Sequence, residues 1–185
     1  MGDGGNVLAV RLWTNTSDET ALETCVREHG GMIYRIAFCV LRNSQDAEDA
    51  AQETFLRALR SRKLADVTDS KAWLARIAWR IALDHRRTES VAIDAIAEPT
   101  SHLPDAESEL LRAERTELLH QLIQSLPRDL RDVVTLSTVQ ELSGTDIAVV
   151  LGIPEASVRT RLHRARALMK EKLEMRWRTP SAERS

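Results

Sequence analysis

The sequence predicts an all-α protein made of two small helical domains joined by a flexible acidic linker. Apolar residues recur at intervals of three and four along most of the chain, and the alternation typical of strands is absent. This helical pattern stops over residues 89–108, where Pro99, Pro104 and several small polar residues stand and large apolar residues are few. With 185 residues and 43% hydrophobic content, the chain can form two cores of modest size. The predicted organisation is a disordered tail over 1–18, a first domain over 19–88, the linker over 89–108, a second domain over 109–176 and a tail over 177–185.

The distribution of charge is more informative than its total. The net charge is −2, so the whole chain is not basic. Basic residues nevertheless gather in two zones, from Lys71 to Arg87 and from Arg159 to Arg178, while acidic residues form a block around Asp46 and a stretch from Glu89 to Glu117. Two basic zones on a mildly acidic chain predict two places where a polyanion binds.

The cysteines and the start of the chain exclude several classes of protein. Cys25 and Cys39 lack the spacing of a metal site, and Gly30-Gly31 between them argues against one uninterrupted helix. Buried structural thiols are therefore favoured over a redox role. The first residues show no signal peptide, and no apolar run has the length of a membrane span. We expect a cytoplasmic protein with no metal, no cofactor and no membrane insertion.

The first domain is expected to contain three helices. One ends near Asn43, and Asn43 or Ser44 caps the next, whose first turn holds Asp46. The third is expected to run from Ser70, a candidate N-cap, to Arg87. The predicted apolar stripe of the middle helix consists of Ala47, Ala51, Phe55, Ala58 and Leu59.

Three carboxylates of the middle helix, Asp46, Asp49 and Glu53, project from one side of it. They are consistent with a solvated acidic surface, with a docking surface for a basic partner, or with a Mg²⁺ site. A Mg²⁺ site would need a second set of carboxylates across a cavity, and the facing segments contain none.

The third helix combines aromatic and basic residues. Its expected core face consists of Leu74, Ile77, Ala78, Ile81 and His85, with His85 as a satisfied core histidine. The other face then holds Arg76, Trp79, Leu83, Arg86 and Arg87. Such a face suits stacking of Trp79 on unpaired bases while arginines hold phosphates. The alternative is that Trp79 packs on a neighbouring helix.

The second domain contains the pattern of a helix-turn-helix. Pro127 stands at the start of one helix, Ser143 with Asp146 can form a capping box for the next, Gly152 supplies a tight turn and Pro154 opens the last helix. The buried faces are expected to comprise Ile147, Val150 and Leu151 in the short helix, and Val158, Leu162, Ala165 and Met169 in the last one. The opposite face carries Ala156, Arg159, Thr160, His163, Arg164 and Ala167, with Arg161 and Arg166 on its flanks. Small residues followed by arginines are typical of a recognition helix in the major groove, although a solvated basic face has the same composition.

These motifs together resemble a known family. Residues 46–55 resemble the polymerase-docking helix of sigma factor region 2, and residues 71–87 resemble its promoter-melting helix. Residues 126–166 resemble region 4, which binds the −35 element. With only these two regions, the chain is similar to the extracytoplasmic-function (ECF) group of RNA polymerase sigma factors, which are not enzymes.

The resemblance implies a role for each motif. It implies contacts with the clamp coiled coil of the polymerase largest subunit from Asp46, Asp49, Gln52 and Glu53. It implies contacts with the −10 element from Arg76, Trp79, Arg80, Arg86 and Arg87, and with the −35 element from Arg159, Thr160, Arg161, His163, Arg164 and Arg166. The implied partners are core RNA polymerase (with its flap for region 4), promoter DNA and an anti-sigma factor.

The chain departs from the family pattern at two places. Trp79-Arg80 stands where the family commonly has Arg-Asn, which implies a different −10 specificity, and Glu141 stands where a glycine is common. Three rival interpretations remain: a helix-turn-helix regulator that acts without polymerase, a Mg²⁺-dependent helical enzyme, and an interaction protein without DNA binding.

Overall fold

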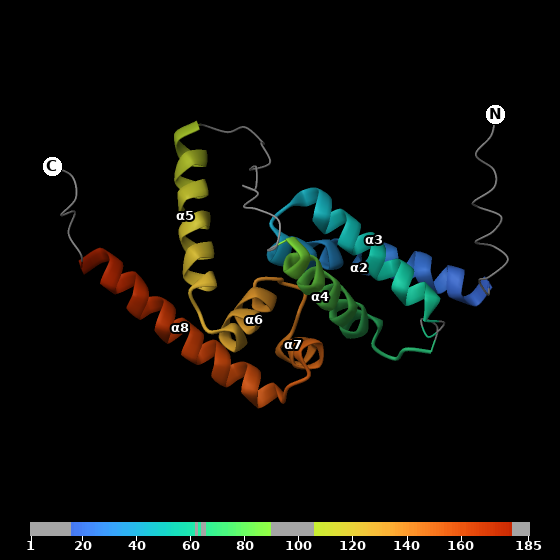
Figure 1. Cartoon of the computed structure of the whole chain (residues 1–185). Coiled ribbons are helices and arrows are strands. Elements are labelled where there is room, and N and C mark those ends of the chain that lie inside the picture. The colour runs from blue at the N-terminus through green and yellow to red at the C-terminus, as the bar shows by residue number, and fades with distance from the viewer. Residues whose placement is uncertain (1–15, 62, 64–65, 90–105, 179–185) are drawn as a thin grey trace. The chain divides into compact units, whose positions relative to one another are not determined.

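A computed structural model describes residues 16–61, 63, 66–89 and 106–178 (Figure 1). The described residues form helices and connecting turns and contain no strand, which confirms the predicted fold class. They divide into two compact units, one built from α2 to α4 and the other from α5 to α8. No helix among the described residues is long and apolar enough to cross a membrane.

The first unit consists of three helices that each pack on the other two. Its helices are α2 (Thr16–Leu41), α3 (Ser44–Arg60) and α4 (Ser70–Glu89). Their shared core contains the fully buried side chains of Ile33 and Ile36 from α2, and of Leu74 and Ile81 from α4. Burial of each such side chain contributes about 1.5–3 kcal/mol of hydrophobic free energy.

The α3 helix presents small residues to this core. Ala47, Ala50, Thr54 and Ala58 are buried, and the Thr54 hydroxyl donates a hydrogen bond of 2.7 Å to the Ala50 carbonyl. The predicted stripe was therefore wrong by part of a turn, since Ala51 is only partly buried. Small side chains let the neighbouring helices approach α3 closely, and this leaves its carboxylates on the outer side.

The α2 helix continues through Gly30-Gly31, contrary to the prediction, and begins at Thr16, within the expected tail. The cost of two glycines in a helix is about 1 kcal/mol each, and packing of α2 on both partners outweighs it. Cys25 and Cys39 are thus separated by about 21 Å of helix, too far for a disulfide. Burial is the main cause that raises the pKa of the Cys25 thiol, and a hydrogen bond with Ser70 lowers it in part.

The helix ends of the first unit follow local chemistry. The Asn43 side chain caps α3 by accepting from the Gln45 and Asp46 N–H groups, as predicted. The predicted cap of α4 was wrong: Asp69, not Ser70, accepts a bond of 3.0 Å from the Ala72 N–H. The Ser70 hydroxyl instead lies 3.2 Å from His29 Nε2 of α2, so it ties two helices together.

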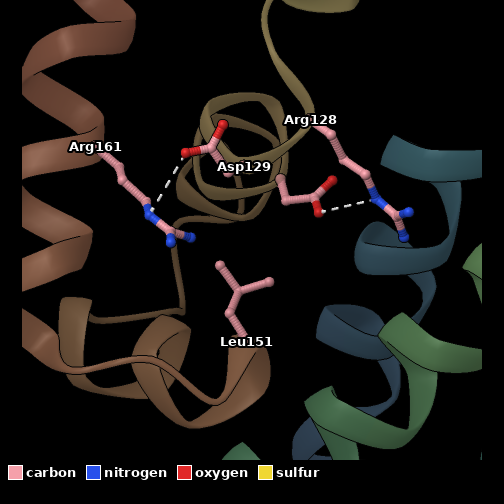
Figure 2. A pocket seen from close by; sticks show the side chains of 5 residues that line it. Arg128, Asp129, Leu151 and Arg161 are labelled. Atoms are coloured by element: carbon pink, nitrogen blue, oxygen red, sulfur yellow. Dashed lines mark ion pairs between the residues drawn. The ribbon is translucent and has the colours of Figure 1, made fainter.

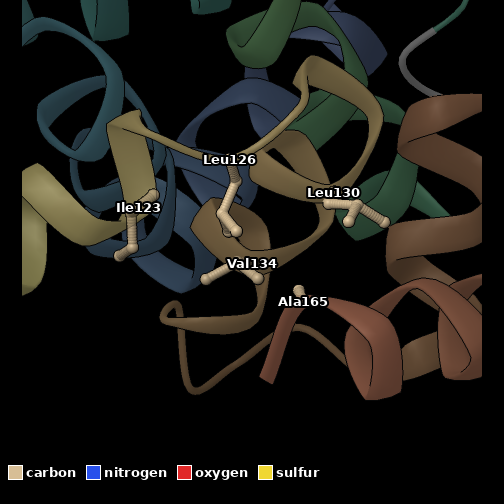
Figure 3. Close-up of a cluster of buried hydrophobic side chains, with 5 residues drawn as sticks. All are labelled: Ile123, Leu126, Leu130, Val134 and Ala165. Atoms are coloured by element: carbon tan, nitrogen blue, oxygen red, sulfur yellow. The ribbon is translucent and has the colours of Figure 1, made fainter. Parts of the chain in front are cut away.

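The second unit contains α5 (Ala106–Gln124), α6 (Arg128–Ser137), α7 (Gly144–Leu151) and α8 (Glu155–Arg178). Figure 3 shows a cluster at the meeting of α5, α6 and α8, formed by Ile123, Leu126, Leu130, Val134 and Ala165. Pro127 stands immediately before α6, as predicted, and its carbonyl accepts from the N–H groups of Leu130 and Arg131.

The predicted boundaries need small corrections. Helix α4 reaches Glu89 and α5 begins at Ala106, so both ends of the predicted linker are helical. The rest of it, residues 90–105, lies outside the described residues, as do residues 1–15 and 179–185. Helix α8 ends at Arg178, two residues into the expected C-terminal tail.

Candidate functional site

The helix-turn-helix of the second unit begins at a complete capping box. Ser143 Oγ accepts a hydrogen bond of 3.1 Å from the Asp146 N–H, and Asp146 Oδ2 accepts one of 2.7 Å from the Ser143 N–H. These bonds satisfy backbone donors at the start of α7 and fix where it begins. The predicted capping box is confirmed.

Glu141 does not disturb the turn that leads into this capping box. Among the described non-glycine residues only Arg42 has a positive φ, of 61°, so the backbone at Glu141 does not need a glycine. The Leu142 N–H closes the turn with a bond of 3.0 Å to the Val139 carbonyl. The departure from the family pattern at Glu141 therefore leaves the helix-turn-helix intact.

The turn between α7 and α8 depends on Gly152 and Pro154. Gly152 has φ 67° and ψ 39°, the left-handed conformation that glycine adopts without steric cost. The Pro154 carbonyl then accepts from the N–H groups of Ser157 and Val158 and starts α8. Both predicted roles are confirmed, and together they set the direction in which α8 leaves the turn.

Helix α8 has a buried side and an exposed side, as its spacing predicts. Val158 and Ala165 are buried, and Leu162 and Met169 are partly buried against the core. The exposed side, which we call the α8 face, consists of Ala156, Arg159, Thr160, His163, Arg164 and Ala167, and Arg166 on its flank is also exposed. The Thr160 hydroxyl donates to the Ala156 carbonyl at 3.0 Å, which leaves its oxygen lone pairs available to an outside donor.

Arg161 does not lie with the rest of this set. Its side chain is 31% exposed, and its Nε lies 3.8 Å from Asp129 Oδ2 on α6 (Figure 2). The pair lines an open hollow together with Arg128, Asp132 and Leu151. Arg161 is thus turned towards α6, although its side chain is long and remains partly accessible.

The α3 carboxylates divide into exposed and engaged groups. Asp49, which accepts a hydrogen bond of 3.5 Å from Gln45 Nε2, is exposed on the outer side of α3, as is the neighbouring amide of Gln52, and Asp46 is partly buried. Glu53 is half-buried, pairs with Arg57, and lies 3.1 Å from His85 Nε2 of α4. Glu53 therefore ties α3 to α4. His85 has a hydrogen-bonding partner, as expected, but its side chain is 35% exposed, so its predicted place in the core was wrong.

Leu56 was missed by the sequence analysis. It is 49% exposed and lies on the outer side of α3, near Asp49 and Gln52 on the helix surface. Single exposed apolar side chains are common on protein surfaces, so only the position of Leu56 beside Asp49 and Gln52 makes it a candidate for a docking contact. Its signal in the sequence was a leucine that lies outside both the predicted apolar stripe and the observed one. We call Asp46, Asp49, Gln52 and Leu56 the α3 face.

The expected position of Trp79 was wrong. Trp79 is only 4% exposed, and Ala75 and Ala82 on the same side of α4 are fully buried. The reason is that α4 packs on both α2 and α3, so that roughly half of its circumference is buried. The alternative, that Trp79 packs on neighbouring helices, is the correct one, and Trp79 is unavailable for stacking on a base.

The exposed part of α4 is nevertheless basic. Arg80 and Arg87 are exposed, while Arg76 and Arg86 are partly buried. On the helical wheel Trp73, which is partly buried, lies about 20° from Arg80, so this aromatic residue is on the same side of α4 as the exposed cations. The sequence analysis did not consider Trp73 because it assumed that α4 has a single core face and placed Trp79 on the opposite, exposed face. We call Trp73, Arg76, Arg80 and Arg87 the α4 face.

The metal hypothesis gains no support from side-chain positions. In the described parts of the chain, no group of three or more His, Cys, Asp or Glu residues is arranged to hold a metal ion. Asp49 is exposed and Asp46 is partly buried, and neither belongs to such a group.

Comparison with known proteins identifies both units. Residues 25–91 match Sigma-70 region 2, and residues 116–169 match Sigma-70, region 4. The RNA polymerase sigma-H factor of Pseudomonas aeruginosa is 35% identical over 85% of this chain and 88% of its own length. The ECF RNA polymerase sigma factor SigW of Bacillus subtilis is 30% identical over 84% of this chain and 90% of its own. The ECF sigma factor SigE of Mycolicibacterium smegmatis is 31% identical over 85% of this chain, which spans 65% of that relative.

The fold also matches solved structures. The structure of CnrH in complex with the cytosolic domain of CnrY aligns with a TM-score of 0.60 at 24% identity, over 94% of this chain and 99% of that one. The sigma factor RpoE, solved in complex with the anti-sigma factor NepR from Bartonella quintana, aligns with a TM-score of 0.57 at 20% identity, over 80% of this chain and 95% of that one. Two helical units of sigma regions 2 and 4, in this order, define a promoter-recognition subunit of RNA polymerase. The chain belongs to the ECF RNA polymerase sigma factors.

Proposed function

We propose that the α8 face binds the −35 element of promoters in the major groove. The observation that carries this proposal is a helix with arginines and a threonine on one exposed side, set at a defined angle by the capped α7 and the Gly152 turn. Arg159 and Arg164 supply donors for guanine edges and phosphates. His163 and Thr160 add shorter polar contacts, and Ala156 leaves room for the helix start to approach the bases.

The α3 face docks on the clamp coiled coil of the polymerase largest subunit in this proposal, and region 4 contacts the flap. Asp49 and Gln52 supply the exposed polar contacts, and Leu56 adds an apolar one. Glu53 contributes mainly by holding α3 against α4, because its carboxylate is already engaged by Arg57 and His85. Burial of an apolar residue inside a polar ring is the usual basis of affinity at such interfaces.

The α4 face contacts the −10 element and its unpaired strand. Arg80 and Arg87 are placed to hold phosphates, and Trp73 offers the aromatic surface that Trp79 lacks. Arg80 replaces the asparagine that the family commonly uses to read a base, so the preferred −10 letters differ from those of relatives. Melting is driven by binding energy without nucleotide hydrolysis, and the chain acts in the cytoplasm as a factor and not as an enzyme.

Control by an anti-sigma factor is part of the same proposal. RpoE, a structural neighbour, was solved with an anti-sigma factor, and CnrH with a domain of CnrY. An anti-sigma factor that covers the α3 face would block polymerase binding directly.

Run-off transcription with core RNA polymerase and promoter fragments tests the proposal. Asp49→Arg and Arg164→Ala should each remove the new transcripts. Two matched controls should keep them: Glu48→Arg, one residue away but about 100° around α3, and Lys170→Ala, a basic residue on the same side of α8 as His163 but about 9 Å further along the helix than Arg164. Tight sequence-specific DNA binding without any polymerase-dependent transcript would instead identify a regulator that acts alone.

A further inference from the structure

The pair between Arg161 and Asp129 sets one arginine of α8 apart from its neighbours. Arg159, Arg164 and Arg166 are exposed, whereas Arg161 is partly buried and turned towards α6. Its Nε lies 3.8 Å from Asp129 Oδ2, and Figure 2 shows the two side chains reaching across the hollow between α6 and α8. Among the arginines at positions 159, 161, 164 and 166 of α8, Arg161 is the one that pairs with a carboxylate of another helix.

This pair is not needed to hold α8 in place. At 3.8 Å, with side chains 31% and 56% exposed, it is an ion pair in contact with water, and such pairs contribute about 0–1 kcal/mol. Helix α8 is already fixed by Val158 and Ala165, which are buried in the core. The main consequence of the pair is therefore where the Arg161 charge sits.

A second ion pair lines the same hollow and provides a comparison. Arg128 Nε lies 3.8 Å from Asp132 Oδ2 along α6, and this pair does not involve α8 (Figure 2). Asp129 and Asp132 thus stand three residues apart on one helix, with equal charge. Of these two ion pairs, the one that Asp129 makes reaches the recognition helix.

We propose that Asp129 is a specificity-determining residue that restrains Arg161 from phosphate contacts. A phosphate contact adds affinity for DNA of every sequence and carries no information about the bases. By holding Arg161 beside α6, Asp129 lowers this general affinity and leaves discrimination to the α8 face. The inference rests on the proposed function, because it requires that α8 binds duplex DNA.

The test measures binding of the full chain to a fluorescein-labelled duplex of scrambled sequence over a range of salt concentrations. Asp129→Asn should bind this duplex about fivefold more tightly than Asp132→Asn does, a ratio equivalent to about 1 kcal/mol. The slope of log K against log salt should become steeper by about 0.9, the value for one added phosphate contact. Both substitutions are isosteric and remove one negative charge, and thermal unfolding followed by circular dichroism verifies that both variants fold.

The double variant Asp129→Asn/Arg161→Gln isolates the pair itself. If Asp129 acts by restraining Arg161, the double variant should bind the duplex no more tightly than Asp132→Asn does. Equal duplex affinity and equal salt slope for Asp129→Asn and Asp132→Asn would overturn the inference. A gain in affinity that persists in the double variant, which lacks Arg161, would overturn it as well. Wild-type affinity in Arg164→Ala would instead remove the proposed role of α8, and the inference with it. Weakened binding by Arg164→Ala, with no difference between the two aspartate variants, would overturn the inference alone.

Discussion

Trp79 and Arg80 are neighbours on α4 that lie in opposite environments, since Trp79 is only 4% exposed and Arg80 lies on the side open to solvent. We predict that Trp79→Ala lowers the free energy of unfolding by about 3–5 kcal/mol, the range for removing a large aromatic side chain from a core. Arg80→Ala should change it by less than about 0.5 kcal/mol, because surface substitutions usually do. Urea denaturation measures both effects.

Substitutions at Arg80 and Trp79 should also affect promoter opening for different reasons, loss of a DNA contact at Arg80 and loss of folding at Trp79. Arg80→Ala should reduce open promoter complexes, as detected by permanganate reactivity of unpaired thymines, while the chain stays folded. Trp79→Phe, which keeps an apolar ring in the core, should retain far more activity than Trp79→Ala. A stable, fully folded Trp79→Ala variant that fails only in promoter opening would contradict the buried position and restore the stacking role.

The contrast shows what spacing can and cannot predict for single residues. Val158, Ala165 and the exposed arginines of α8 were placed correctly, because α8 has one buried side. Trp79 was misplaced because α4 packs on two helices, and a periodic pattern does not state how many neighbours a helix has. The pairing of Arg161 with Asp129 joins α8 to α6 through tertiary packing, which no local spacing encodes.

For helices and turns, the sharpest test compares Gly144, the first residue of α7, with Gly152, the residue that caps its C-terminal end. Gly152 has φ 67°, and no atom lies within 4 Å of the point that a Cβ would occupy there, so a substitution meets backbone strain and no clash. Gly144 lies inside α7 with a negative φ, and the nearest atom to its Cβ position, Glu155 Oε1, is 4.0 Å away. We predict that Gly152→Ala destabilises the second unit by about 1 kcal/mol. Gly144→Ala should be neutral or stabilising by up to about 1 kcal/mol.

Thermal unfolding and −35 duplex binding of these two variants check the prediction. Gly152→Asn should recover part of the loss, since asparagine tolerates the left-handed conformation better than alanine does. Equal effects of alanine at both glycines would contradict the assigned turn. The glycine, serine and proline signals around α7 were readable in the sequence because turn and cap chemistry is local. The opposite error at Gly30-Gly31 arose because tertiary packing decided the continuity of α2.

For the whole molecule, the division into two helical units was predictable from the interruption of the helical pattern between them. Their boundaries were less predictable, because helices α4, α5 and α8 extend into segments with weak apolar periodicity. Each proposed DNA contact is small, so neither unit needs to bind a promoter strongly alone. Docking on polymerase converts the second contact into an intramolecular step with a high effective concentration.

Because effective concentration depends on the length of chain between the two units, lengthening the segment between them should weaken promoter binding. For a purely flexible tether, an inserted Gly-Ser stretch as long as residues 90–105 doubles the length, and effective concentration falls with roughly the 3/2 power of length. Promoter occupancy at limiting factor should therefore fall by about threefold, measured by run-off transcription on a promoter with both elements. The same insertion should leave the unfolding of each unit unchanged. A loss of occupancy far beyond threefold would contradict this prediction. If replacement of residues 90–105 by a Gly-Ser stretch of equal length caused the same loss, this segment would make contacts of its own instead of acting only as a tether.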